Sequence, residues 1–149
     1  QMAGLMCLTL IKMDERTAFR GWARTARLAA DEAGDPLTHS WVRAQEAYGH
    51  YYSGNLTGAI HVAQHAQVLS GKVSSAGAAL AAALEARAQA VLGRADAARS
   101  ALQRAEACLF HLGAGSIGTS TFDYNETQLR FHEGNTLTHL HDTSAAWQT

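Results

Sequence analysis

The feature that most constrains the fold is a recurring pattern: a helix of mixed polar and apolar residues, a short turn, and a second helix with alanine at regular steps. The copies occupy residues 37–70, 76–108 and 123–149. Their turns align at Gly54, Gly93 and His141, with spacings of 39 and 48 residues. Such a period is typical of helical solenoids, in which each helix pair buries its apolar face against its neighbours. We therefore expect an all-α fold, a right-handed α-solenoid of antiparallel helix hairpins.

Equivalent positions around the turns carry the same kind of residue. An acidic residue followed by a small one lies eight positions before the turn, and an alanine lies five positions after it. The acids are Glu46, Glu85 and Glu133, and the alanines are Ala59, Ala98 and Ala146. Because helical solenoids offer extended binding surfaces, the repeat favours a binding function over catalysis.

Composition agrees with a helical chain whose net charge is close to zero. Most residues are types that lose little on entering a helix, and the 149 residues include one proline. The net charge of −1 gives no overall attraction to nucleic acid or to anionic lipid. No segment reaches the roughly 18 apolar residues of a membrane span, so no membrane partner is expected. Cys7 and Cys108 each stand alone in a helical pattern, which favours reduced thiols and a cytoplasmic location.

The chain is expected to form one domain over residues 1–149, as a fragment of a longer protein. The repeats are expected at residues 1–34, 35–72, 74–112 and 123–149, the last one truncated. Helices are predicted at 2–12, 15–32, 36–53, 56–70, 74–92, 95–112, 123–140 and 143–149. Asp35 is the expected N-cap before Pro36, and Asp123 is expected to form a capping box with Glu126. The glycine-rich segment 113–122 is interpreted as an inserted loop, either a tolerated surface loop or part of a binding face.

Two kinds of motif carry a resemblance to known proteins. Ala47, the turn Gly54-Asn55-Leu56, and then Ala59, Ala63 and Ala66 are similar to the tetratricopeptide repeat in spacing. The strings at residues 82–96 and 124–143 resemble the C-terminal region of actinobacterial regulatory proteins, in which a helix-turn-helix domain commonly precedes repeats of this kind. The resemblance implies the sensing or assembly region of a transcription regulator. DNA would then be contacted only through a domain outside this chain.

The tetratricopeptide resemblance also implies where a ligand would bind, because the first helix of each pair lines the concave side of such stacks. Aromatic residues at helical spacing on the first such helix are joined by polar and aromatic residues on the next two. The candidate binding residues are Trp41, Tyr48, Tyr51, Tyr52, Arg87, Gln128, Phe131, Asn135 and His139. Rings offer contact area, and polar groups could hold a peptide backbone or a carboxylate. The alternative is that the aromatic residues only pack between repeats.

Two sets of charged residues have structural interpretations. An arginine precedes an acid by three residues at Arg43 and Glu46 and again at Arg130 and Glu133, and Glu85 occupies the matching place. An acid that recurs on the inner face of a helix favours ion pairs between repeats. The basic run comprises Arg16, Arg20, Arg24 and Arg27. Its spacing places it on one side of a helix, where it is either a solvated face or a contact for phosphates or an acidic partner.

Catalytic and metal motifs are weak. His61 and His65 have the i, i+4 spacing of helical metal ligands, but no third ligand is evident, so no metal site is expected. The spacing of Gly113, Gly115 and Gly118 matches a dinucleotide fingerprint, yet a helix is predicted before it where that fingerprint needs a strand. We expect no enzyme activity and no cofactor. The alternative is a metal-dependent enzyme, which would be supported by stoichiometric metal that is retained through purification and lost in His61→Ala.

The sequence therefore predicts a non-catalytic regulatory domain that binds a protein, a peptide or a small molecule. It is expected to be the sensing part of a bacterial transcription regulator and to form a homo-oligomer. The alternative is an oligomerisation or protein-interaction scaffold without a small ligand, because the ends of truncated solenoids expose apolar faces.

Overall fold

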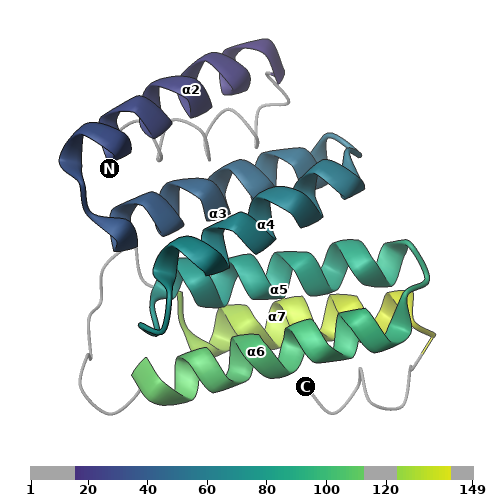
Figure 1. The fold of residues 1–149 in the computed structure, drawn as a ribbon. Coiled ribbons are helices and arrows are strands. Elements are labelled where there is room, and N and C mark those ends of the chain that lie inside the picture. The colour runs from purple at the N-terminus through teal and green to yellow at the C-terminus, as the bar shows by residue number, and fades with distance from the viewer. Residues whose placement is uncertain (1–15, 113–123, 142–149) are drawn as a thin grey trace.

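The computed structural model describes residues 16–112 and 124–141, and this part of the chain is all-helical. Its helices, labelled as in Figure 1, are α2 (Arg16–Ala33), α3 (Pro36–Tyr52), α4 (Leu56–Ser70), α5 (Ala76–Val91), α6 (Ala95–Leu112) and α7 (Glu126–His139). They stack from α2 at the top of the view to α6 and α7 at the bottom (Figure 1). The predicted helices at 2–12 and 143–149, the loop 113–122, Cys7 and Ala146 lie outside the described residues.

Each predicted helix inside the described ranges is present, with bounds that shift by a few residues at most. The start of α3 is as predicted: Asp35 accepts hydrogen bonds from the backbone N–H groups of Leu37 and Thr38, and Pro36 opens the helix. The predicted start at Asp123 is wrong, because α7 begins at Glu126. Its N-cap is Asn125, which forms a reciprocal capping box with Gln128.

The three aligned turns share one backbone conformation. Gly54, Gly93 and His141 have φ angles of 80°, 71° and 59°, in the left-handed region that ends many helices. His141 is the one non-glycine residue with positive φ among the residues described, so it adopts what glycine adopts in the other two copies. At each turn the preceding residue donates to the carbonyl four positions back, as in Ser53 to Gly49, and the turn residue to the carbonyl three back. The register read from the sequence is therefore also the register of the backbone.

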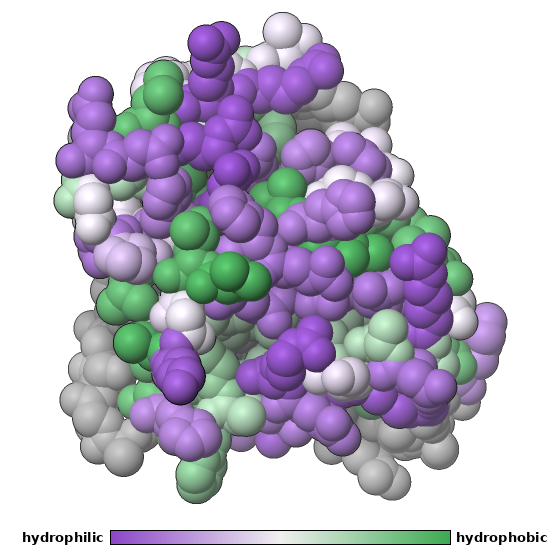
Figure 2. Space-filling view, viewed as in Figure 1, coloured by the Kyte–Doolittle hydropathy of each residue, from purple (hydrophilic) through white to green (hydrophobic). Residues whose placement is uncertain are grey.

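Neighbouring helices pack in a regular order. Helix α4 contacts α3 and α5, and α6 contacts α5 and α7, while α5 also contacts both α3 and α7. Helix α2 packs on α3. Helix α5 therefore lies at the centre. It contacts α3 and α7, which like α5 precede the aligned turns, and also α4 and α6, which follow them. On the face shown in Figure 2, hydrophilic residues predominate, with a hydrophobic patch near the carboxyl end of α4, where Val68 is exposed.

Small residues let these helices approach closely. Residues 79–90 of α5 are all buried, and most of them are alanine. A Cβ on Gly77 would lie 2.7 Å from the backbone nitrogen of Trp41, so the start of α5 lies directly against α3. A Cβ on Gly49 would overlap the ring of Phe19, which packs from α2 onto α3. The core is thus a set of close helix contacts made by alanine and glycine, with few large side chains between them.

No helix within the described ranges has the length and apolar character needed to cross a lipid bilayer. Cys108 is a free thiol that packs against the core, and its Sγ donates to the backbone oxygen of Ser75 at 3.4 Å.

Candidate functional site

The most unusual group in the described structure is Arg87, a buried cation enclosed by aromatic rings. It lies on α5 and is only 4% exposed. Its guanidinium carbon is 4.3 Å from the ring centroid of Tyr51 and 5.7 Å from those of Tyr52 and Phe131. Tyr51 and Tyr52 come from α3, whereas Phe131 comes from α7. Arg87 therefore joins three helices through cation–π contacts.

A second layer of rings surrounds this contact. Tyr48 stacks on Tyr52 with 5.0 Å between ring centroids, and its edge meets His132 at 6.2 Å. Tyr124, just before α7, lies 5.7 Å from the same histidine. Nη1 of Arg87 lies 3.2 Å from Nδ1 of His132. We call this set of residues the Arg87 cluster; it comprises Tyr48, Tyr51, Tyr52, Arg87, Tyr124, Phe131 and His132.

The cluster keeps its histidine neutral. Burial, and then the charge of Arg87, lower the pKa of His132 to about 3. A neutral ring can accept at Nδ1, so Arg87 donates this hydrogen bond and the ring proton is assigned to Nε2.

The two stacked tyrosines titrate in opposite directions. Burial, and then the hydrogen bond with Tyr52, raise the pKa of Tyr48 to about 12. Burial also acts to raise the pKa of Tyr52, but hydrogen bonding with Tyr48 and with Arg87 outweighs it and lowers that pKa. Hydrogen bonds and the nearby cation therefore make Tyr52 the more acidic member of the pair.

Two buried polar atoms of the cluster have no hydrogen-bond partner in residues 16–112 and 124–141. They are Nε of Arg87 and the hydroxyl of Tyr124. No carboxylate in these ranges pairs with Arg87, whereas Arg27, Arg43, Arg104 and Arg130 each bond to a glutamate. A buried cation held only by rings and neutral groups is expensive, because burial removes its hydration without an opposite charge to replace it.

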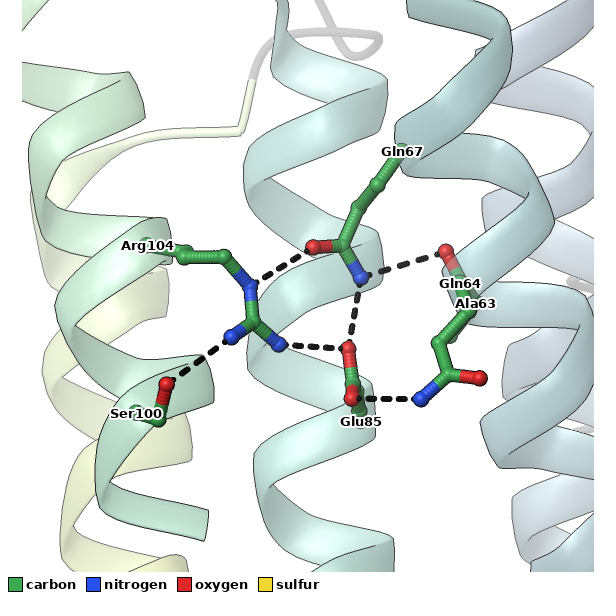
Figure 3. Close-up of polar contacts among 6 residues, drawn as sticks. All are labelled: Ala63, Gln64, Gln67, Glu85, Ser100 and Arg104. Atoms are coloured by element: carbon green, nitrogen blue, oxygen red, sulfur yellow. Dashed lines mark hydrogen bonds and ion pairs between the residues drawn. The ribbon is translucent and has the colours of Figure 1, made fainter. Parts of the chain in front are cut away.

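A contrasting site lies two residues earlier on the same helix, around Glu85 (Figure 3). Its Oε1 accepts from Gln64 at 2.9 Å, and its Oε2 accepts from Gln67 at 2.7 Å and from Arg104 at 2.8 Å. Arg104 also donates from Nε to Gln67 at 3.1 Å and from Nη1 to Ser100 at 3.0 Å. This Glu85 network connects α4, α5 and α6, and each charge in it has opposite or polar partners.

The two equivalent glutamates are also paired. Glu46 bonds to Arg27 of α2 and, at 2.7 Å, to Arg43 of its own helix. Glu133 bonds to Arg130 at 2.8 Å. The recurring acid predicted ion pairs between repeats, and Glu46 forms one with Arg27. The ion pair of Glu85 with Arg104 lies within one predicted repeat, and that of Glu133 with Arg130 lies within α7, so the prediction is wrong for these two. Since these acids are tied to neighbours, their recurrence marks how the helices are joined.

The structure brings together about half of the candidate binding residues. Tyr48, Tyr51, Tyr52, Arg87 and Phe131 form the core of the Arg87 cluster. The remaining candidates are Trp41, Gln128, Asn135 and His139. Trp41 packs beside Ala26 and Ala30 of α2, and Gln128 caps α7. Asn135 donates to the backbone oxygen of Phe131 at 2.8 Å, and His139 is exposed near the end of α7.

Sequence reasoning missed Tyr124 and His132. His132 lies next to Phe131 on α7, but the candidates on this helix were taken from positions equivalent to the aromatic residues of α3, and His132 is not one of them. Tyr124 precedes the helix, so helical periodicity gives no signal for it.

Other motifs have simpler roles in the part of the chain that is described. His61 and His65 are exposed on α4, and no group of three metal-ligating side chains occurs within the described ranges. Arg20 and Arg24 are exposed, but Arg27 turns onto Glu46, so the basic run is interrupted by a structural ion pair.

Comparison with protein-family models, curated proteins and solved structures found no match.

Proposed function

We propose that this chain is a non-catalytic binding domain, a tetratricopeptide-repeat-like α-solenoid that binds its ligand on the side where α3, α5 and α7 meet. The ligand is a protein segment, a peptide or a small molecule. In the setting that the sequence resemblance implies, the domain is the sensing part of a cytoplasmic bacterial transcription regulator, and DNA is contacted through a separate domain.

The packing order supports a repeat architecture of this type. Helices α3 and α4 are followed by α5 and α6 in the same relation, and α7 stands to α5 as α5 stands to α3. The shared turn conformation at Gly54, Gly93 and His141 is what repeated helix pairs would produce. Fully buried Ala47 and Ala86 occupy equivalent places in the first helix of two pairs.

The Arg87 cluster is the observation that carries the binding role. Phe131 is 58% exposed and Tyr52 is 49% exposed, beside a buried arginine with a spare donor. Aromatic residues and arginine are the residue types that contribute most to binding sites in proteins. A side chain that only filled space between helices would be covered more fully than these two rings.

The test is a selection of short peptides from a random display library on the immobilised chain, followed by measured affinities for two variants. Replacing both Tyr52 and Phe131 by alanine should lower the affinity for the selected peptides by about thirtyfold or more, since the loss of one hot-spot aromatic residue costs about 2 kcal/mol. Phe110→Ala is the matched control, because Phe110 is an aromatic residue 83% exposed on α6, away from the cluster. Equal affinities for the wild type and the double variant would overturn the assignment.

A self-association scaffold is the second candidate, and exposed apolar residues favour it. Val68 is 74% exposed and Phe110 is 83% exposed, on helices other than those of the cluster. Sedimentation over a range of concentrations tests it: a dimer that Val68→Asp or Phe110→Asp abolishes supports the scaffold, and a monomer throughout rejects it.

A further inference from the structure

The buried charge of Arg87 lacks the partner that every other buried or half-buried charge described here has. Glu46 and Glu85, which are 7% and 3% exposed, are each bonded to arginine. Arg87 is as deeply buried, yet its contacts are three ring faces and neutral groups, among them a histidine kept uncharged. The electrostatic asymmetry on α5 calls for an anion at Arg87.

The unpartnered Nε of Arg87 is the donor that an anion could use. Nη1 is directed to His132, and the side chain also hydrogen-bonds with Tyr48 and Tyr52, while Nε has no partner within the described ranges. The guanidinium carbon lies 4.3 Å from the ring centroid of Tyr51 on α3 and 5.7 Å from that of Phe131 on α7, so a ligand group that reaches Nε would lie beside these rings. Arginine can bond in a bidentate way to a carboxylate or to a phosphate, but a carboxylate carries one negative charge and matches the single charge of Arg87. A phosphate group carries more than one negative charge near pH 7, and the excess would be buried without a partner.

Access to this edge depends on the outer rings. Tyr52 and Phe131 contact Arg87 but are themselves about half exposed, so the proposed access to Nε requires one of these side chains to rotate aside. Rotations of exposed side chains take picoseconds to nanoseconds. The same rings would then flank the ligand group.

On these grounds we propose that Arg87 is a receptor for one carboxylate group, which binds at Nε beside the rings of α3 and α7. The inference rests on the proposed binding function and gives its ligand a chemical class. The carboxylate belongs either to a small organic acid or to the carboxyl terminus of a peptide.

Nitrogen-15 NMR of the arginine Nε–Hε groups of the whole chain is the direct test. The Arg87 signal is identified by its loss in Arg87→Lys. Arg104 provides an internal control, because its Nε already donates to Gln67 and should not respond. Acetate, inorganic phosphate, and acetyl-trialanine with a free or an amidated carboxyl terminus are titrated at constant ionic strength.

We expect acetate to shift the Arg87 signal saturably and phosphate to shift it at least about tenfold more weakly, a difference of about 1.4 kcal/mol. If the free-acid peptide binds more tightly than acetate and the amidated peptide causes no shift, the natural carboxylate is the carboxyl terminus of a peptide. Equal affinity of acetate and the free-acid peptide identifies a small organic acid. Either result supports the proposal.

A saturable response to phosphate alone, or no saturable response to any probe, overturns it. The proposed binding function is judged separately, because selected peptides that lose affinity in the Tyr52→Ala/Phe131→Ala variant would still establish the surface. Binding of those peptides in Arg87→Lys at wild-type affinity would then show that the surface acts without the carboxylate.

Discussion

Two buried charges lie two residues apart on α5, and they are held in opposite ways. Glu85 faces α4 and α6, where two glutamines and Arg104 satisfy both of its oxygens. Arg87 faces α3 and α7, where rings and neutral groups surround it and Nε has no described partner. A charge whose partners all belong to the chain stabilises the fold, whereas a charge without one is available to a ligand. This contrast is the basis of our proposal that one face of α5 holds the fold together while the other binds a ligand.

The largest expected effect is the loss of the Glu85 network. Glu85→Ala removes the acceptor for three side chains, and breaking a buried ion pair costs about 3–5 kcal/mol. Because the Arg104 side chain is 46% exposed and stays solvated, we expect the free energy of unfolding, measured in urea, to fall by about 3 kcal/mol. Glu126→Ala is the matched control, since the Glu126 side chain is 77% exposed and its pair with Arg130 should contribute less than about 1 kcal/mol. Similar losses in the two variants would contradict the structural role of Glu85.

The next largest effect is a dependence of folding stability on pH that arises from His132. Its pKa is lowered to about 3 in the folded chain, so below its unfolded value near 6.5 the unfolded state binds the proton more readily. Stability is therefore fully present above about pH 6.5 and is lost as the pH falls toward 3, by roughly 2 kcal/mol at about pH 5.

His132→Gln should flatten this part of the profile, measured by urea unfolding between about pH 7.5 and 5, where carboxylates remain mostly ionised. The same slope in the wild type and in the variant would remove His132 as its cause.

A smaller effect is expected when the Arg87 charge is removed. Arg87→Met keeps a long unbranched side chain. The loss of cation–π contacts destabilises the fold by about 0.5–2 kcal/mol, whereas removal of a buried unpaired charge stabilises it. The net change in unfolding free energy should lie within about 1 kcal/mol. A loss as large as that of Glu85→Ala would mean that Arg87 is a structural residue like its neighbour, and the comparison would fail.

The smallest expected effect is a difference in pKa between the stacked Tyr48 and Tyr52. Ultraviolet titration should show Tyr52 ionising before Tyr48, because Arg87 and Tyr48 lower the pKa of Tyr52 while burial raises that of Tyr48 to about 12. In Arg87→Met the pKa of Tyr52 should rise, since the nearby cation is gone. An unchanged titration in that variant would place the guanidinium farther from Tyr52 than described here.

The sequence predicted the repeat register well because a turn depends on few residues. His141 was aligned with Gly54 and Gly93 as a turn position, and the structure gives all three residues a positive φ. The start of α7 was less determined: Asp123 with Glu126 and Asn125 with Gln128 both have capping-box spacing, and the structure uses the second pair.

The candidate site was predictable only in part. Spacing along single helices brought forward the tyrosines of α3, but the partners of a buried charge come from several helices at once. Gln64, Gln67 and Arg104 could not be assigned to Glu85 without the packing of α4 and α6 on α5. That no carboxylate of residues 16–112 and 124–141 pairs with Arg87 could not be predicted for the same reason, since it depends on how several helices pack around α5.

The contrast between Glu85 and Arg87 is tested most directly by urea unfolding of the wild type, Glu85→Ala and Arg87→Met, each with acetate and with chloride at equal ionic strength. A ligand that binds only the folded state stabilises it, and Arg87→Met corrects for general salt effects of acetate. We predict that Glu85→Ala unfolds at lower urea yet is stabilised by acetate as much as the wild type. Arg87→Met should unfold near the wild-type midpoint and show no acetate-specific stabilisation. Loss of stability in both variants, with equal responses to acetate in all three proteins, would contradict the account.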